Sequence, residues 1–385
     1  MKAVTSSNIY RQIINNFGVF FIYLLVNSLF ITKYGGHYNV VLLAGYVFLM
    51  LGLGILYIKI NLNDIFYKAV FWAGTVLFFI FSIYLNYKVD GNSLNVDRWS
   101  AMETGIKAIL DGQYPYNLPD HMGQESSNLP VLIILGIPFY LLFGSVGYLQ
   151  SFSFLLFTYL IFKIFKDYRQ RLAVLLLLFL SPGYLWEVYV KSDLFSNFII
   201  VSGFTYLIWN KFLVKNSIKP GLVSFLTVLI VLTRLSAIIP LTLLLFRKFY
   251  DFSLKEKVRF TVVFILTGSC IAYVFFHNAP DFNVFIEHNP FVIQGAKQPL
   301  VLSLSYIILS FILSFRVKSF YQIMCWGGMM LFVCVFIPFV LFFIEYGYTN
   351  MITNSFFDLS FFNMAMPFIM IAAVLGTFKN KYKQD

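Results

Sequence analysis

Charged residues are scarce in this sequence, and their scarcity excludes a soluble fold. Asp, Glu, Lys and Arg make up 12% of the 385 residues, whereas 59% are hydrophobic, including 47 phenylalanines. A soluble domain of this length cannot hide so much apolar surface, and the apolar residues fall in repeated runs near the ~20 residues that a helix needs to cross a bilayer. The sequence therefore predicts an all-α, multi-pass integral membrane protein.

Several chemical signatures are also missing. The three cysteines, Cys270, Cys325 and Cys334, lie inside apolar runs, which argues against disulfides and against a zinc site. The chain has no Gly-rich phosphate-binding loop, no HExxH pair, no Ser/His/Asp order and no internal repeat of the transporter kind. The carboxylates of the polar segments lack tight spacing, so we expect no cofactor, and a bound divalent metal is the less favoured alternative.

About twelve membrane spans are predicted in one transmembrane domain over residues 1–385. They lie near residues 17–32, 40–58, 69–86, 148–164, 172–186, 194–209, 220–233, 235–247, 260–276, 300–314, 321–343 and 359–377. The segment 130–143 is short for a crossing and contains two prolines, so we expect it on the outer surface, within an outer loop over residues 87–147. No small-residue cleavage pattern follows the first apolar run, so we expect this span to be retained.

The net charge of +11 is interpreted as a topology signal and not as a sign of nucleic-acid binding. With 130–143 outside, most of the 28 Lys and Arg residues fall in one set of loops and most of the 17 acidic residues in the other. Lys and Arg concentrate in cytoplasmic loops. We therefore expect cytoplasmic N- and C-termini and a site on the outer face of a bacterial or archaeal plasma membrane, with membrane lipid and no nucleic acid as partners.

The longest polar interval, residues 90–130, is the centre of the predicted site. Ser100 and Glu103 have the spacing of a capping box, and apolar residues at helical spacing follow on one face. A short helix of this kind is suited to lie at a membrane interface. Asp97 stands just ahead of it, and we expect Asp97 to be the catalytic residue; a helix-capping role is the alternative.

Further polar residues stand where apolar runs end. A buried or interfacial charge is costly, so such groups are functional candidates, and an outward arginine is suited to bind a phosphate bidentately. The candidates are Trp99, Tyr114, Tyr116, Glu187, Lys191, Asp193 and Arg234, with Asp281, Glu287, His288 and Lys297 in a late loop.

Structural roles are the alternatives for these candidates. The Tyr114-Pro115-Tyr116 segment is also typical of a rigid turn with interfacial aromatics. Glu187 and Asp193 can mark the ends of spans, Arg234 can extend from a helix end to the lipid headgroups, and His288 can belong to a solvated loop.

The order of these motifs resembles the GT-C superfamily of membrane glycosyltransferases, and most closely its polyprenol-phosphate-mannose-dependent branch, family 87. The resemblance covers roughly residues 80–250. It rests on Asp97 and the short helix, the Asp111-Gly112-Gln113-Tyr114-Pro115-Tyr116 run, the proline-led segment after it, Lys191-Ser192-Asp193-Leu194 and Thr233-Arg234. Two features depart from the family: three predicted spans precede the acidic loop instead of one, and Asp97 has no acidic neighbour of D-x-D type.

The resemblance implies an inverting hexosyltransferase, such as a mannosyltransferase of cell-envelope glycans. A polyprenyl-phosphate sugar would be the donor and a lipid or glycan hydroxyl the acceptor. Asp97 would act as base, and Arg234 and Lys191 would bind the donor phosphate. Sugar and acceptor contacts would come from Trp99, Glu103, Tyr114, Tyr116, Glu187, Asp193 and His288.

Two other functions stay open at the level of sequence. A polymerase or ligase of polyprenyl-linked glycans has a similar number of spans, but it relies on outward arginines, which are few here. A flippase or transporter of lipid-linked sugars would place charges in mid-span at broken helices, whereas the charges here gather at one face. The sugar, the acceptor, the length of the lipid and the oligomeric state are not determined by the sequence.

Overall fold

Every regular element is a helix in the part of the chain that the computed structural model describes, residues 6–295 and 298–378. This confirms the predicted all-α class. Lys297, named above in the late loop, and both ends of the chain lie outside the described residues. The chain divides into two compact units: unit 1 comprises Met1–Phe78, Thr158–Trp186 and Ser319–Asp385, and unit 2 comprises Phe79–Phe157 and Glu187–Lys318.

Among the described residues, six helices are long and apolar enough to cross a membrane, or up to nine if each of three bent pairs is one span. The predicted count of about twelve is not confirmed. Several predicted spans are short helices: α10 (Pro220–Val231) and α17 (Met366–Phe378) have 12 and 13 residues. At 1.5 Å per residue, neither is long enough for a hydrocarbon core of about 30 Å.

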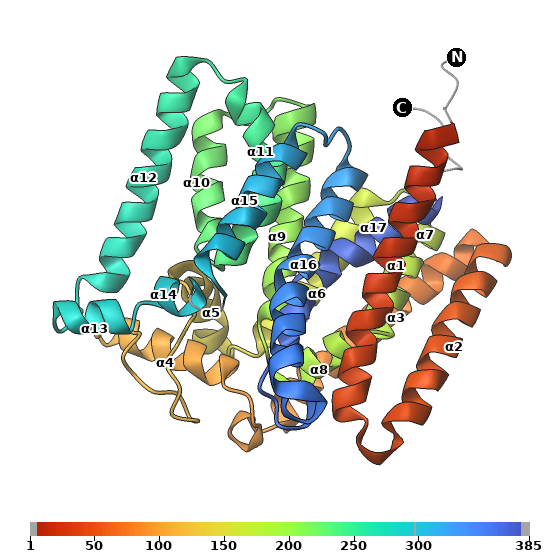
Figure 1. Ribbon diagram of the computed structural model, residues 1–385, viewed down its shortest axis with the longest axis horizontal. Coiled ribbons are helices and arrows are strands. Elements are labelled where there is room, and N and C mark those ends of the chain that lie inside the picture. The colour runs from red at the N-terminus through yellow and green to blue at the C-terminus, as the bar shows by residue number, and fades with distance from the viewer. Residues whose placement is uncertain (1–5, 296–297, 379–385) are drawn as a thin grey trace. The chain divides into compact units, whose positions relative to one another are not determined.

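Unit 1 is built around α17, which is apolar on all sides and almost completely buried. It packs against α1, α7 and α16, so its hydrophobicity reflects burial in protein (Figure 1). The elements of unit 1 are α1 (Ser6–Tyr34), η1 (Gly36–Tyr38), α2 (Asn39–Lys59), most of α3 (Asp64–Lys88), α7 (Tyr168–Phe179), α16 (Phe320–Tyr348), η5 (Thr349–Thr353), η6 (Leu359–Met364) and α17.

The predicted span 172–186 is broken into two helices, α7 and α8 (Pro182–Val190), which meet at 63°. Pro182 causes the break because it lacks an N–H group and disfavours helical backbone at the residue before it. Within unit 1, the Asn27 side-chain oxygen accepts hydrogen bonds from the Ser181 hydroxyl at 2.7 Å and from the Gly183 N–H at 3.2 Å. These bonds satisfy polar groups at the break.

Two arginines that contributed to the predicted topology signal are buried helix caps in unit 1. One Arg169 nitrogen, Nη2, donates to the carbonyls of Tyr57, Ile58 and Ile60 at 2.6–3.0 Å, at the C-terminus of α2. Arg171 donates to the Phe165 carbonyl at 2.9 Å, just after α6 (Tyr148–Ile164). Cations are favourable at the carbonyl ends of helices, so these two charges stabilise the fold locally.

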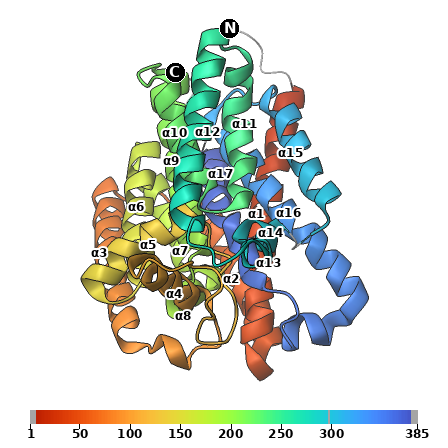
Figure 2. The ribbon, with the colours of Figure 1, turned by 90° about the vertical axis from the view of Figure 1, so that its left-hand side faces the viewer.

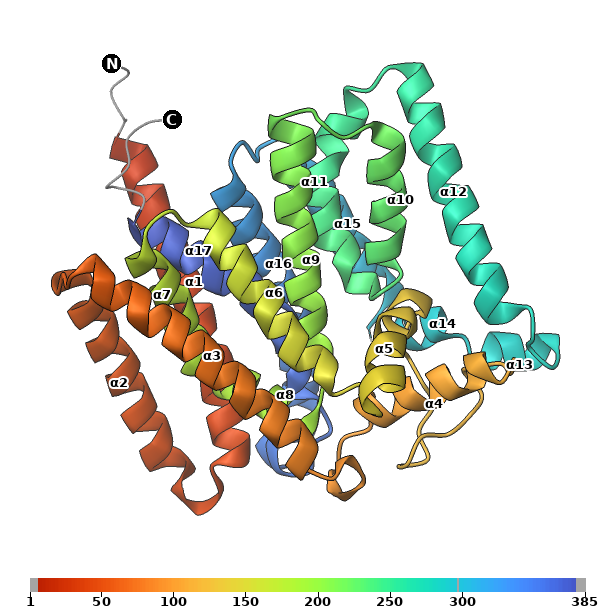
Figure 3. The same cartoon turned by 180° about the vertical axis from the view of Figure 1, so that it is seen from behind.

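In unit 2, successive helices run back and forth between two ends (Figures 1 and 3). These helices are α9 (Leu194–Ile208) with the π-turn η3 (Trp209–Val214), α10, η4 (Leu235–Ala237), α11 (Ile238–Tyr250), α12 (Leu254–Phe276) and α15 (Leu300–Ser314). α10 packs on α12, and α11 packs on α15. We call the end with the α9 N-terminus, the α10–α11 connection and the α12 C-terminus the site end, and the opposite end the basic end.

The short elements of unit 2 gather at the site end, as Figure 2 shows from the side. They are η2 (Gly91–Ser93), α4 (Arg98–Leu110), α5 (Pro130–Phe143), α13 (Phe282–Glu287) and α14 (Pro290–Gly295). The segment 130–143 is therefore one helix, and it meets α6 at an angle of 111°. It does not form a straight crossing of its own.

The short helix predicted after Asp97 is present as α4, but its capping differs from the prediction. The helix begins at Arg98, two residues before the predicted cap, so Ser100 lies inside it and its hydroxyl donates to the Asp97 carbonyl at 2.8 Å. Glu103 does not close a capping box and accepts the Val146 N–H at 3.0 Å. Gly112, with a φ of +69°, ends α4 in a Schellman motif.

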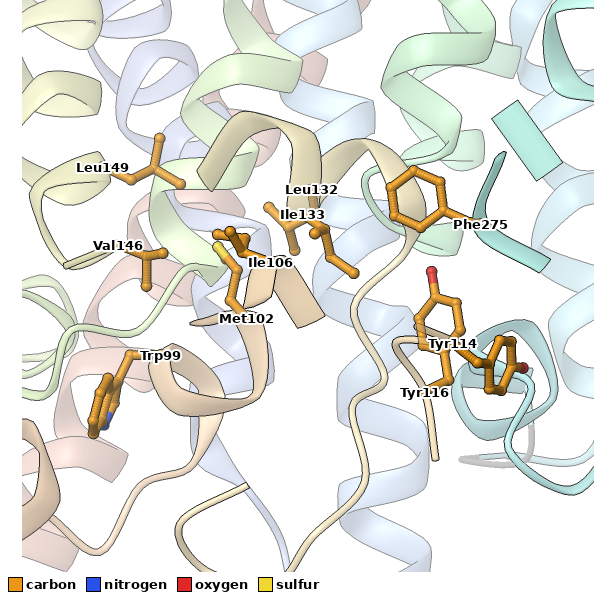
Figure 4. Close-up of a cluster of buried hydrophobic side chains, with 10 residues drawn as sticks. All are labelled: Trp99, Met102, Ile106, Tyr114, Tyr116, Leu132, Ile133, Val146, Leu149 and Phe275. Atoms are coloured by element: carbon orange, nitrogen blue, oxygen red, sulfur yellow. The ribbon is translucent and has the colours of Figure 1, made fainter. Parts of the chain in front are cut away.

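The apolar face of α4 is buried in protein and does not form a free interfacial surface. Met102 and Ile106 are 1% and 0% exposed and pack against Leu132 and Ile133 of α5 (Figure 4). Tyr114, Tyr116 and Phe275 extend the same cluster to the end of α12. This packing fixes α4, and with it the position of Asp97, against the helices of unit 2.

Candidate functional site

A group of buried polar side chains surrounds the turn between α8 and α9. We call Gln150, Glu187, Lys191, Ser192, Asp193 and Arg234 the α8–α9 cluster; each is at most 8% exposed. The Glu187 carboxylate accepts the Phe195 N–H at 2.7 Å and the Gln150 side-chain N–H at 3.2 Å. Gln150 also donates to the Ser192 carbonyl at 2.6 Å. Glu187 and Gln150 therefore hold the turn in place from inside the protein.

Arg234 and Asp193 form a buried ion pair across this turn. Arg234 Nη2 lies 2.7 Å from Asp193 Oδ2, and each side chain is 4% exposed. Asp193 is the N-cap residue of α9, but its side chain does not cap the helix. The pair makes the two predicted site residues neighbours in space, and it neutralises the guanidinium that the sequence analysis assigned to the donor phosphate.

Lys191 occupies a different environment in the same turn. Its φ of +56° is in the left-handed region, and its ammonium donates to the Asn86 carbonyl at 3.2 Å. The ammonium also lies 6.0 Å from the centre of the Trp99 ring, at a distance that allows a cation–π interaction. Burial lowers the pKa of Lys191 below its usual value, although the carboxylates of Glu103 and Asp90 oppose this change.

Glu103 of α4 faces the same region. Burial raises the pKa of this carboxyl group above its usual value, while the hydrogen bonds from Val146 and Ser145 and the charges of Lys107 and Lys191 partly offset the effect. The pKa values of Glu103 and Lys191 are thus shifted toward each other. Opposed shifts of this kind are typical of functional sites, although structural ion networks produce them too.

Asp97 stands at the start of α4, two residues from Trp99. It is half-buried and occupies the N-cap position, but it makes no side-chain capping hydrogen bond. Asp97 thus has the position of the alternative capping role without the side-chain capping hydrogen bond. Because Trp99 lies near Lys191, and Lys191 precedes the Asp193–Arg234 pair by two residues, these contacts connect the α4 N-terminus to the α8–α9 cluster.

A second group of candidate residues contains Tyr114, Tyr116 and His288. Together with Glu125, we call them the His288 cluster. The Tyr114 hydroxyl donates to the His288 carbonyl at 3.3 Å, and His288 Nδ1 lies 2.8 Å from the Glu125 carboxylate. The Tyr116 ring stacks on Phe276 at 5.4 Å between ring centres. Both tyrosines are at least 97% buried, and burial raises the pKa of Tyr114 to about 12. They form part of a packed aromatic cluster.

Hydrogen bonds from side-chain amides join the segment 278–294 to the polar interval that includes α4. The Gln294 amide accepts the Leu235 N–H at 3.1 Å and donates to the Ser127 carbonyl at 2.6 Å. Asn278 donates to the Gly112 carbonyl at 2.8 Å. Because Leu235 follows Arg234, Gln294 also fixes the connection that carries the buried arginine.

Charge separates the two ends of unit 2. Among the described residues, the connections at the basic end carry Lys211, Lys215, Lys219, Arg247, Lys248, Lys255, Lys257, Arg259, Arg316 and Lys318, with Asp251 and Glu256 as the acids. The site end carries Asp90, Asp97, Glu103, Asp111, Asp120, Glu125, Glu187, Asp193, Asp281 and Glu287, with the bases Lys88, Arg98, Lys107, Lys191 and Arg234. The predicted segregation of charge is therefore also a segregation in space within unit 2.

Several buried polar atoms of the site end have no hydrogen-bond partner in the described part of the chain. They include Asp193 Oδ1, Arg234 Nε, Ser192 Oγ, Asn86 Oδ1 and Trp99 Nε1. Buried polar groups are nearly always paired, so such atoms indicate where water or a ligand binds. No group of three or more His, Cys, Asp or Glu residues able to hold a metal ion is found in the described ranges.

Sequence reasoning missed four residues that shape the site: Asn86, Gly147, Gln150 and Gln294. Asn86 and Gln150 lie inside predicted spans, and a polar side chain within an apolar run was the signal that could have identified them. Gly147 and Gln294 carry no such signal, because their importance comes from close contacts between distant segments.

No protein-family model, no curated protein and no solved structure matches this chain.

Proposed function

We propose that this protein is an integral-membrane glycosyltransferase that moves a hexose from a polyprenyl-phosphate donor to an acceptor hydroxyl at the outer membrane face. The observation that carries the proposal is the meeting of three candidate segments at one end of unit 2. These are the α4 N-terminus, the α8–α9 turn and the α10–α11 connection, joined by the Lys191–Trp99 and Asp193–Arg234 contacts. Carboxylates and cations side by side are what transfer between a phosphate and a hydroxyl requires.

The reaction has one proton to move and one anion to stabilise. The acceptor oxygen attacks the anomeric carbon, the bond from that carbon to the phosphate oxygen breaks, and the configuration inverts. Asp97 takes the proton of the hydroxyl, and the polyprenyl phosphate leaves with the bonding electron pair. Carboxylates nearby balance the positive charge of the oxocarbenium-like transition state, and Lys191 of the α8–α9 cluster stabilises the departing phosphate.

An apolar groove in unit 2 supports a lipid-linked donor. It has a volume of about 260 Å³ and lies among α10, α11, α12 and α15. Its lining includes Val231 and Ile238, which stand three and four residues from Arg234, and continues along α11 to Phe249. We propose that the isoprenoid tail lies in this groove while the sugar phosphate reaches the site end.

The segregated charge supports the proposed orientation. Cytoplasmic loops are enriched in Lys and Arg, so the basic end is assigned to the cytosol and the site end to the outer face. A donor in the outer leaflet then meets the carboxylates of the site end directly. The identities of the hexose and of the acceptor are questions for assay.

Replacement of Asp97 tests the proposal. Purified protein is incubated with labelled polyprenyl-phosphate hexoses and an acceptor lipid extract, and the covalent product is measured. Asp97→Asn keeps the shape of the side chain but removes the base, so we expect turnover to fall by about 10²–10⁴-fold while donor binding is retained. Asp111→Asn, the same change at the other end of α4, is the matched control and should retain turnover.

Other products would identify other functions. Extension of the acceptor by whole repeat units would indicate a glycan polymerase or ligase. Counter-flow of a lipid-linked sugar in vesicles without covalent product would indicate a flippase. Undiminished turnover of Asp97→Asn would refute the role of Asp97 as base.

A further inference from the structure

We propose that Lys191 and the indole N–H of Trp99 form an anion subsite for a phosphate group, and that Lys191, not Arg234, receives the charge of the ligand. The identification of this phosphate with that of the glycosyl donor rests on the proposed function. The subsite itself is defined by contacts within unit 2, so the two can be tested separately.

Lys191 has spare hydrogen-bonding capacity. An ammonium has three N–H donors, and the described residues provide one acceptor, the Asn86 carbonyl at 3.2 Å. No carboxylate oxygen of the described residues lies within ion-pair distance of Lys191, and the residue is 8% exposed. Only neutral groups contact this buried cation directly, and the charges of Glu103 and Asp90 act on it from beyond ion-pair distance, so the site is suited to bind an anion.

Trp99, whose ring the Lys191 ammonium faces, supplies a second donor. Its indole Nε1–H is buried and has no partner in the described ranges, and its ring centre lies 6.0 Å from the Lys191 ammonium. The side-chain oxygen of Asn86 is also buried without a partner. Two donors and one positive charge match phosphate oxygens, and the Asn86 oxygen can accept a proton from a phosphate O–H group.

Two glycines leave room for these side chains. A Cβ atom at Gly147 would lie 2.9 Å from Lys191 Cδ and still closer to the Asn86 side-chain oxygen. A Cβ atom at Gly91 would lie 2.5–2.6 Å from atoms of the Trp99 ring. Both distances are too short for real contacts, so the positions of Lys191 and Trp99 depend on glycine at residues 147 and 91.

Arg234 is less suited to this role, because it already has an anionic partner. Its guanidinium pairs with Asp193 at 2.7 Å, and both side chains are 4% exposed. A phosphate at Arg234 would compete with a buried carboxylate and would approach its negative charge. Burial lowers the pKa of Lys191, and a bound phosphate would favour its charged form again, which provides an electrostatic reason for binding at Lys191.

The experiment measures binding without sugar transfer. The full-length protein in detergent is titrated by calorimetry with farnesyl monophosphate, with farnesol and with inorganic phosphate. We expect wild type to prefer farnesyl monophosphate over farnesol. Lys191→Met should lower the affinity for farnesyl monophosphate by about tenfold or more, as expected for loss of a hydrogen bond to a charged group. The affinity for farnesol should be unchanged. Trp99→Phe, which keeps a ring but removes the N–H, should lower the affinity for farnesyl monophosphate by a smaller factor.

A glycine pair provides a matched control. Gly147→Ala should lower the affinity for farnesyl monophosphate because the new methyl group displaces Lys191. Gly203→Ala, in α9, adds the same methyl group where no atom lies within 4 Å, and it should bind like wild type. This pair keeps the proposal testable if Lys191→Met does not fold. Inorganic phosphate that displaces farnesyl monophosphate would identify free phosphate as sufficient, and failure to displace it would identify the lipid-linked phosphate as the ligand.

Other outcomes would overturn the inference. Unchanged affinity in folded Lys191→Met and Gly147→Ala would do so, as would loss of binding confined to the double variant Asp193→Asn/Arg234→Gln. If binding depends on Lys191 but no polyprenyl-phosphate hexose is turned over, the subsite stands and the proposed function fails. If sugar is transferred but the affinity for farnesyl monophosphate does not depend on Lys191, the function stands and this inference fails.

Discussion

Two ion pairs at the site end of unit 2 have almost the same length and very different surroundings. Arg234 and Asp193 are 2.7 Å apart with both side chains 4% exposed, whereas His288 and Glu125 are 2.8 Å apart with side chains 23% and 43% exposed. Distance alone would rank the pairs as equals. Burial separates them, because removing either partner of the first pair leaves an uncompensated charge inside the protein, whereas the Glu125 carboxylate of the second pair remains in contact with water.

The difference teaches that charge and spacing do not define the role of a candidate residue. Arg234 was expected to bind a ligand phosphate, but its charge is balanced inside the protein. Lys191, two residues from Asp193, forms no ion pair with a described residue, although the charges of Glu103 and Asp90 act on it. The α8–α9 cluster thus contains one cation that is paired within the fold and one that forms no ion pair with a described residue.

The largest expected effect comes from breaking the buried pair. Arg234→Met leaves Asp193 buried without a countercharge, and we expect the free energy of unfolding to fall by about 3–5 kcal/mol. The double variant Asp193→Asn/Arg234→Gln removes both charges and should recover most of this loss. Denaturant unfolding in mild detergent measures both variants. If the double variant is no more stable than Arg234→Met, the pair is not the source of the loss.

The half-buried carboxylate of Glu103 predicts how the stability of the protein depends on pH. Because burial raises the pKa of Glu103, the folded state binds its proton more tightly than the unfolded state, so wild type gains stability as the pH falls from neutral through that folded pKa. Glu103→Gln is always neutral and should be more stable than wild type at neutral pH, by less than the loss at Arg234. Its advantage should shrink as the pH is lowered.

Melting temperatures of both proteins across this pH range test the expectation. Asp111→Asn, an exposed change at the other end of α4, is the control and should leave the pH profile as it is in wild type. An advantage of Glu103→Gln that is constant with pH would mean that the ionisation of Glu103 is not its cause.

The smallest effect is expected at the exposed pair. Glu125→Gln should change the free energy of unfolding by about 0–1 kcal/mol, because the Glu125 side chain is 43% exposed and the amide that replaces its carboxylate can still accept a hydrogen bond from His288 Nδ1. Added salt should reduce even this difference, since exposed charges are screened. A loss as large as that of Arg234→Met would show that exposure does not separate the two pairs.

The fold was predictable where hydrophobicity alone decides structure. Long apolar runs gave α2, α3, α12 and α15, and the polar interval with its short helix gave α4. Apolar runs that form short buried helices, such as α17, were interpreted as spans. The sequence of an apolar helix has the same pattern whether lipid or protein covers the helix. The count of about twelve spans followed from this ambiguity.

Of the candidate site, the sequence indicated residues and not their pairings. It placed Asp97 just ahead of a short helix and Lys191, Asp193 and Arg234 at the ends of apolar runs. It could not show that Arg234 meets Asp193, since 41 residues separate them along the chain. Nor could it show that Gly147 leaves space for Lys191, because that need exists only after packing.

The sequence by itself determined a helical chain of membrane type, with acidic segments gathered apart from basic ones, because composition and charge order are properties of the chain. The tertiary structure alone decided which charges are neutralised and which polar atoms lack a partner. Those properties depend on distances and burial, and only packing between segments remote in the chain sets them.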